Sequence, residues 1–81
     1  MTVGVYSMRD LKAEFTAPTY SANDAVAIRN FESAITQSQD VLFTHRNDFQ
    51  LFRIGSYDTE SGKLTPEELP VLIADGKDVV G

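Results

Sequence analysis

Seven aromatic and basic side chains are the clearest candidates for a binding function in this sequence. They lie on or near segments that have the pattern of strands, and they are Tyr6, Arg9, Arg46, Phe49, Phe52, Arg53 and Tyr57. Aromatic faces can stack on bases while arginines contact phosphates, which is the usual platform for single-stranded nucleic acid. The sequence therefore predicts a nucleic-acid-binding site made from these residues. Strand aromatics of a small domain also commonly form its core, and this alternative stays open.

Groups for catalysis or metal binding are few. His45 is the only histidine and cysteine is absent, which excludes the usual zinc ligand sets, disulfides and thiol chemistry. No G-x-S-x-G motif is present, and the segment 58–63 lacks the spacing of a phosphate-binding or calcium-binding loop. We therefore expect a protein that is not an enzyme, with no metal and no cofactor.

The charge of the chain is acidic and uneven. The net charge is −5, with −1 over residues 1–57 (five basic, six acidic) and −4 over residues 58–81 (two basic, six acidic). This balance argues against strong non-specific binding to nucleic acid, although a local basic groove remains compatible with it. Three or four available cations would give log K against log salt a slope of about −2 to −3 on single strands.

Length and hydropathy place the chain in one small domain. The 81 residues contain no run of 18 apolar residues, so no membrane span is expected, and residues 1–10 lack the pattern of a signal peptide. A domain of this size buries a small share of its surface, so oligomerisation would stabilise it. We expect a single domain over residues 1–81, a homodimer, and frayed residues at 76–81.

Local patterns predict the elements of the first half. Residues 2–8 alternate in the manner of a strand, and residues 14–20 read as an edge strand or extended arm because they contain Pro18. A helix is predicted over residues 21–37, with Ser21 as its N-cap and Asp24 completing a capping box. Apolar residues at three- and four-residue spacing form its buried face: Ala27, Ile28, Phe31, Ala34 and Ile35.

The second half predicts a hairpin. Residues 38–48 read as a polar loop, residues 49–57 as a strand, and residues 58–62 as a turn in which Gly62 takes positive φ. A return strand starts at Lys63 and is cut short by Pro66, while residues 66–75 are ambiguous. Strict alternation places two sets of residues on opposite faces of the strand 49–57: Phe49, Leu51, Arg53, Gly55 and Tyr57 on one, and Gln50, Phe52, Ile54 and Ser56 on the other.

These elements predict an α+β fold. A small antiparallel sheet of three to four strands would carry one main helix on one face. The second face would then be covered by the C-terminal segment, by a second subunit or by a ligand.

Three segments carry a resemblance to a known family. They are VYSMRD (residues 5–10), APTYSANDAVAIRNF (17–31) and NDFQLFRIGSYDTESGKL (47–64). In their order and spacing they resemble the small nonstructural protein of gokushoviruses, tailless phages with single-stranded DNA genomes. The similarity covers roughly residues 3–64. The sequence departs from the family pattern at Asn47, where a proline is common, and after Pro66, where the match is loose.

The resemblance implies a protein of the host cytoplasm that acts in single-stranded DNA genome replication or packaging. The family has no settled catalytic residues, so none is transferred to this chain. Two hypotheses follow. In the first the protein binds single-stranded DNA directly; in the second it is an adaptor that recruits phage or host replication proteins without touching DNA.

Overall fold

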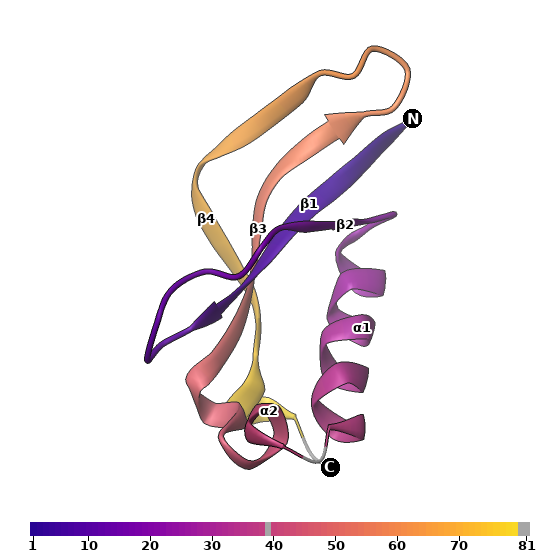
Figure 1. Ribbon diagram of the computed structural model, residues 1–81. Helices are drawn as coiled ribbons and strands as arrows, with labels where there is room; N and C mark the ends of the chain where they lie inside the picture. The colour runs from indigo at the N-terminus through magenta and orange to yellow at the C-terminus, as the bar shows by residue number, and fades with distance from the viewer. Residues whose placement is uncertain (39, 80–81) are drawn as a thin grey trace.

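Four antiparallel strands form one twisted sheet, and the main helix lies along it (Figure 1). The computed structural model describes residues 1–38 and 40–79. Strands β1 (Thr2–Asp10), β2 (Thr19–Ser21), β3 (Phe49–Asp58) and β4 (Leu64–Asp75) are ordered β2-β1-β3-β4. Helix α1 (Asp24–Gln37) connects β2 to the short helix α2 (Val41–Thr44), and 3-10 turns follow at Arg46–Asp48 and Gly76–Asp78. The predicted α+β class, with one main helix on a small antiparallel sheet, is confirmed.

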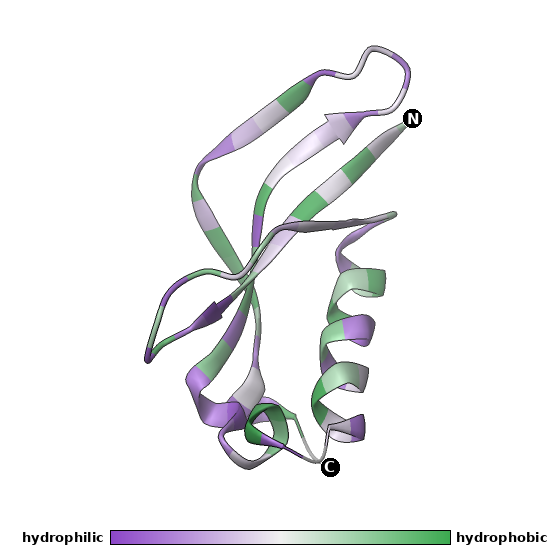
Figure 2. Cartoon of the chain, in the orientation of Figure 1, coloured by the Kyte–Doolittle hydropathy of each residue, from purple (hydrophilic) through white to green (hydrophobic). Residues whose placement is uncertain are grey.

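The core lies between α1 and one face of the sheet. It contains Tyr6, Ala27, Phe31, Ile35, Phe49, Leu51 and Val79, with residues of α2 packed against it. Ala27, Phe31 and Ile35 belong to the apolar helix face that the sequence predicts. Hydropathy alternates along the first part of β1 (Figure 2), but the buried residues of this strand, Val3, Tyr6 and Ser7, lie on both of its faces. Among the described residues, no helix has the length and hydrophobicity needed to cross a membrane.

The start of α1 differs from the sequence prediction. The helix begins at Asp24, and its N-cap is Asn23, whose side chain accepts a hydrogen bond from the Val26 amide at 2.9 Å. Ser21 instead lies in β2, where it pairs with Gly4. Pairing with β1 keeps this segment extended for longer than the capping pattern suggests, so an asparagine later in the chain caps the helix.

The C-terminal third is also more ordered than predicted. Strand β4 continues past Pro66 and Pro70 because it is an edge strand, where one side of the backbone needs no ladder partner. Gly76–Asp78, in the segment expected to fray, form a 3-10 turn, and Val79 is buried in the core. Residues 80–81 lie outside the described residues. Residues 41–44, predicted as loop, form α2, which Asp40 caps through a bond from the Leu42 amide.

The β3–β4 hairpin turns as predicted. Its loop ends at Gly62, which adopts a φ of 75°, a left-handed conformation that suits glycine. The Gly62 amide donates to the Asp58 carbonyl and the Asp58 amide donates to the Lys63 carbonyl, which closes the loop.

Candidate functional site

A bulge in β3 decides which side chains share a face of the sheet. Tyr6 pairs with Arg53 while Val5 pairs with Gly55, so Ile54 is the extra residue of β3 in this ladder. Cross-strand partners project to the same face, and one extra residue reverses the alternation beyond it. Tyr57 therefore lies on the face of Phe52, opposite Arg53, and the predicted sharing of one face by Arg53 and Tyr57 is wrong.

We call the side of the sheet away from α1 the open face. Register places on it four residues of β1 (Val3, Val5, Ser7, Arg9), Tyr20 of β2, Phe52 and Tyr57 of β3, and Leu64 and Leu72 of β4. Several of these apolar side chains are exposed, among them Tyr20, Leu64 and Leu72. The helices contribute their apolar side chains to the core on the other face. The open face therefore carries several accessible apolar side chains, although Val3 and Ser7 on this face are themselves buried.

Two of the seven predicted site residues lie in the core. Tyr6 is 1% exposed and Phe49 is also buried, and both belong to the cluster packed against α1. Neither ring can stack on a base while the core stays closed. Their alternation in β1 and β3 is equally typical of core residues, which is the alternative that the sequence leaves open.

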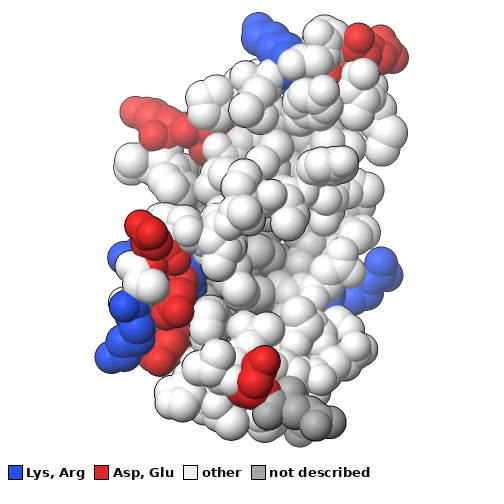
Figure 3. All heavy atoms as spheres, viewed as in Figure 1, with Lys and Arg blue, Asp and Glu red and all other residues white. Residues whose placement is uncertain are grey.

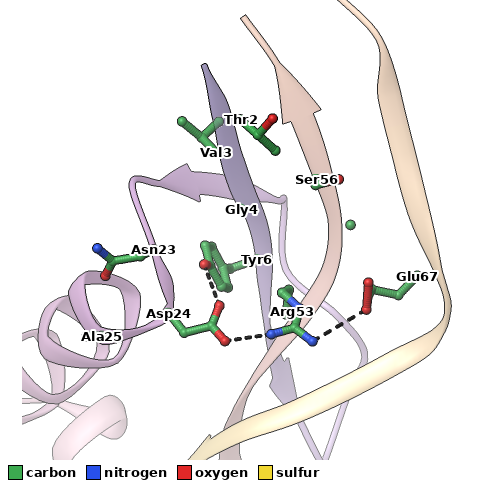
Figure 4. A pocket seen from close by; sticks show the side chains of 11 residues that line it. Thr2, Val3, Gly4, Tyr6, Asn23, Asp24, Ala25, Arg53, Ser56 and Glu67 are labelled. Carbon is green, nitrogen blue, oxygen red and sulfur yellow. Dashed lines mark hydrogen bonds and ion pairs between the residues drawn. The ribbon is translucent and has the colours of Figure 1, made fainter.

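Arg53 lies on the helix side of the sheet and is held by two carboxylates (Figure 4). Its Nη1 lies 2.6 Å from Asp24 Oδ2, and its Nη2 lies 3.5 Å from Glu67 Oε2. Asp24 also accepts a hydrogen bond from the Tyr6 hydroxyl at 2.7 Å. Contact with a phosphate would require Arg53 to give up these partners, so we remove it from the candidate site.

The same cluster perturbs the titration of Tyr6. Burial of the ring, and then the hydrogen bond to the Asp24 carboxylate, raise the pKa of Tyr6 to about 12. The ring lies across Gly4, where an added Cβ would stand 2.5 Å from its Cζ atom, so a side chain at Gly4 would displace the tyrosine. Tyr6, Asp24, Arg53 and Glu67 line a depression of about 490 Å³. The side chains of this cluster therefore link α1, β1, β3 and β4 to one another.

Arg46 also makes its hydrogen bonds within the fold. Its Nε donates to the Val79 carbonyl at 3.1 Å, and its Nη1 donates to the Phe43 carbonyl at 3.2 Å. The guanidinium carbon lies 4.8 Å from the centre of the Phe43 ring. Arg46 thus ties the turn after α2 to the C-terminal segment.

Arg9 and Phe52 are the predicted residues that come together on the open face. The guanidinium carbon of Arg9 lies 5.7 Å from the centre of the Phe15 ring, and Phe15 packs edge-on against Phe52 with ring centres 5.4 Å apart. We call Arg9, Phe15 and Phe52 the phenylalanine patch. The arm before β2 places Phe15 there, because Phe15 bridges to Arg9 and the Thr16 amide donates to the Met8 carbonyl.

The other end of the open face carries Tyr57 and Tyr20. Tyr57 pairs with Val3 and Leu64, and Tyr20 pairs with Val5, so these side chains surround one groove of about 400 Å³. We call the groove lined by Val3, Val5, Pro18, Tyr20, Tyr57 and Leu64 the tyrosine groove. Tyr57 follows Phe52 by five positions along β3, which is about 16 Å along a strand.

Sequence reasoning missed Phe15 and Tyr20 as site residues, although both are aromatic and flank Pro18. A signal was present, because an aromatic residue in an edge arm has no second strand to cover it. Sequence reasoning also missed Asp24 and Glu67 as the partners of Arg53. Their separation along the chain offers no local signal for this pairing.

On the face that Figure 3 shows, the charged side chains lie toward the margins. In the view of Figure 3, lysines, arginines and acids stand around a broad area without charge. On the open face the register places Arg9 as a cation and Asp75, which accepts from Gln50 Nε2 at 3.1 Å, as an anion. In the described part of the chain, no three histidine, aspartate or glutamate residues are grouped in a way that could hold a metal ion.

Comparison with known proteins matches the chain to a protein family. The model of the family described as Phage ORF5 protein matches residues 3–79, which is almost the entire chain. No curated protein matches it, and no solved structure does.

Proposed function

We propose that this chain, which belongs to the Phage ORF5 protein family, binds single-stranded DNA during replication or packaging of a phage genome. The observation that carries the proposal is the phenylalanine patch, where an arginine lies against an exposed aromatic ring on an open sheet face. In this role the protein is not an enzyme. The resemblance to the nonstructural protein of gokushoviruses supports the narrower version, in which it acts in the host cytoplasm on a single-stranded DNA genome.

The patch has the two components that single-stranded DNA requires. Phe15 is 42% exposed and can stack on a base, while Phe52 supports it from β3. Arg9 is exposed beside the ring and can contact the adjoining phosphate. Lys12, in the turn that follows β1, offers a second cation nearby in the chain. Stacking on such platforms contributes about 1–3 kcal/mol per base.

The salt dependence that we expect for this binding is weaker than the one expected from the sequence alone. Arg46 and Arg53 have partners within the fold, which leaves Arg9 and Lys12 as the cations near the patch. At roughly −0.7 per neutralised phosphate, one or two contacts give a slope of about −0.7 to −1.4 in log K against log salt. We therefore expect weak binding that depends more on stacking than on charge.

The proposal is tested by fluorescence anisotropy of a labelled oligodeoxythymidylate at low and moderate salt. Arg9→Ala and Phe15→Leu should each weaken binding, whereas Arg29→Ala should leave it unchanged. Arg29→Ala is the matched control, because it removes the same charge from the exposed side of α1. Phe15→Leu keeps an apolar side chain and removes the stacking ring. If both patch variants bind as tightly as the wild type while staying folded, DNA does not use this patch.

The adaptor hypothesis is the second candidate, and the charges of the chain favour it. The net charge is −5, and two of the arginines that could contact DNA are engaged within the fold. An apolar open face with few charges suits a protein partner better than a phosphate backbone. If the folded wild-type chain shows no binding to single-stranded DNA at low salt, the adaptor function replaces the DNA-binding one.

A further inference from the structure

The tyrosine groove is the part of the open face that the proposed DNA contact does not use. Its lining contains tyrosine, valine, leucine, proline and threonine side chains and no charged one. Tyr20 is 76% exposed and Leu64 is 61% exposed, although both are large and largely apolar. A groove of this composition has a recognition chemistry different from that of the phenylalanine patch.

We propose that the tyrosine groove is the site at which a second copy of this chain docks, face to face, to form a homodimer. Sheets that pack in this way bring the side chains of their two inner faces together as a common core. The two copies would present the same surface to each other, as a two-fold symmetric interface requires. The second copy would then cover the open face of the sheet at this groove.

The exposed tyrosines of the groove provide roughly a quarter of the surface that a dimer needs, so the interface would extend over the adjoining strands. A stable interface buries roughly 800 Å² on each partner, which is about 15% of the 5424 Å² of accessible surface of this chain. With roughly 200 Å² for a tyrosine side chain, the exposed 76% of Tyr20 and 36% of Tyr57 alone provide about 220 Å². Leu64, Pro18 and the neighbouring strand surfaces adjoin them in the same groove.

The charges favour a second copy over other occupants. Two identical surfaces repel each other when either carries a net charge, and the groove lining carries none. Single-stranded DNA needs cations beside the stacking groups, and these are also absent from the lining. Asp58 and Glu60 lie at the adjoining end of β3, where each is 3.7 Å from the N-terminal amine. This end therefore resembles the polar rim of an interface.

The inference rests on the groove alone and is independent of DNA binding. A dimer would, however, carry two phenylalanine patches in one particle. Two weak sites that are linked in this way can bind one strand more tightly than either site alone. The proposed pairing would therefore strengthen the proposed DNA contact, even though neither depends on the other to be tested.

The experiment measures mass in solution, without DNA, by sedimentation equilibrium of the full chain. At tens of micromolar the wild type should have twice the chain mass of 9.0 kDa. Leu64→Glu places two like charges in the apolar interface and should raise the dissociation constant at least roughly tenfold. Leu69→Glu is the matched control, because Leu69 is 74% exposed on the same strand but lies outside the groove lining. It should leave the dimer intact.

A second variant covers the case in which Leu64→Glu fails to fold. Tyr20→Ala removes a highly exposed ring, so it should leave the fold intact and weaken the dimer by about tenfold as well. Circular dichroism checks the fold of each variant. A monomeric wild type overturns the proposal. The proposal is also overturned if a folded Leu64→Glu or Tyr20→Ala variant forms a dimer as stable as that of Leu69→Glu. Loss of DNA binding in a chain that still dimerises would remove the proposed function and leave this inference in place.

Discussion

Replacement of Tyr6 by phenylalanine should remove most of the loss of stability that the protein undergoes in alkali. The Tyr6 hydroxyl is buried and donates to Asp24 Oδ1 at 2.7 Å. The pKa of Tyr6 is thereby raised from 10.0 to about 12 in the folded state. Because the folded pKa lies above the unfolded one, the neutral hydroxyl stabilises the fold. Its contribution is complete below about pH 10 and is lost as the pH rises through about 12.

The size of the effect follows from the two pKa values. A difference of about two pH units corresponds to about 2.7 kcal/mol at the limit, and about 1.4 kcal/mol of it is lost by about pH 11. These figures are upper limits, because the Asp24 side chain is 40% exposed and water can partly replace the hydrogen bond. Near pH 8, Tyr6→Phe should lower the free energy of unfolding by about 1 kcal/mol, the usual cost of one lost hydrogen bond.

Urea unfolding of wild type and Tyr6→Phe near pH 8 and pH 11 measures this difference. The wild type should be the more stable protein near pH 8, and the two should become similar near pH 11. Tyr20→Phe is the control, because the hydroxyl of Tyr20 belongs to an exposed side chain. The stability of this variant should follow that of the wild type at both pH values. If Tyr6→Phe and wild type lose equal stability over this range, the buried hydroxyl does not control the alkaline transition and the reasoning is refuted.

Two further predictions concern α1. Asn23→Ala should lower the free energy of unfolding by about 1 kcal/mol because it removes the acceptor for the Val26 amide, whereas Ser21→Ala should change it little. Equal costs in urea unfolding would contradict the assignment of Asn23 as the cap. Phe31→Ala should cost about 3–5 kcal/mol, close to the whole stability of so small a domain, and an unchanged melting midpoint would place Phe31 outside the core.

Local patterns of the sequence were sufficient for several parts of the fold. The spacing of Ala27, Phe31 and Ile35 identified the buried face of α1, and Gly62 marked the hairpin turn with its positive φ. Pro18 marked the arm whose continuation forms the edge strand β2. These features depend on residues within a few positions of one another, where backbone preferences and side-chain period act directly.

The faces of β3 could not be predicted in this way. Strict alternation joins Tyr57 to Arg53, but the extra residue Ile54 in the ladder with β1 moves Tyr57 to the open face. A bulge of this kind is stabilised by pairing with the neighbouring strands. Gly55, beside Ile54, is a residue type that often marks a bulge, but its presence alone does not specify which residue is the extra one. Only the assembled sheet brings Phe52 and Tyr57 to one surface.

Residue types and local spacing were enough to predict the α+β class, the helix and its apolar face, the hairpin turn and the set of aromatic and basic residues available for binding. The tertiary structure decided which of those residues are accessible. Arg53 and Arg46 are cations with no evident partner in the sequence, and the fold engages them with Asp24 and with the Val79 carbonyl, 29 and 33 residues away. Arg9 stays exposed beside Phe15. The physical reason is that the environment of a charge depends on contacts between distant segments, which residue type and local spacing do not specify.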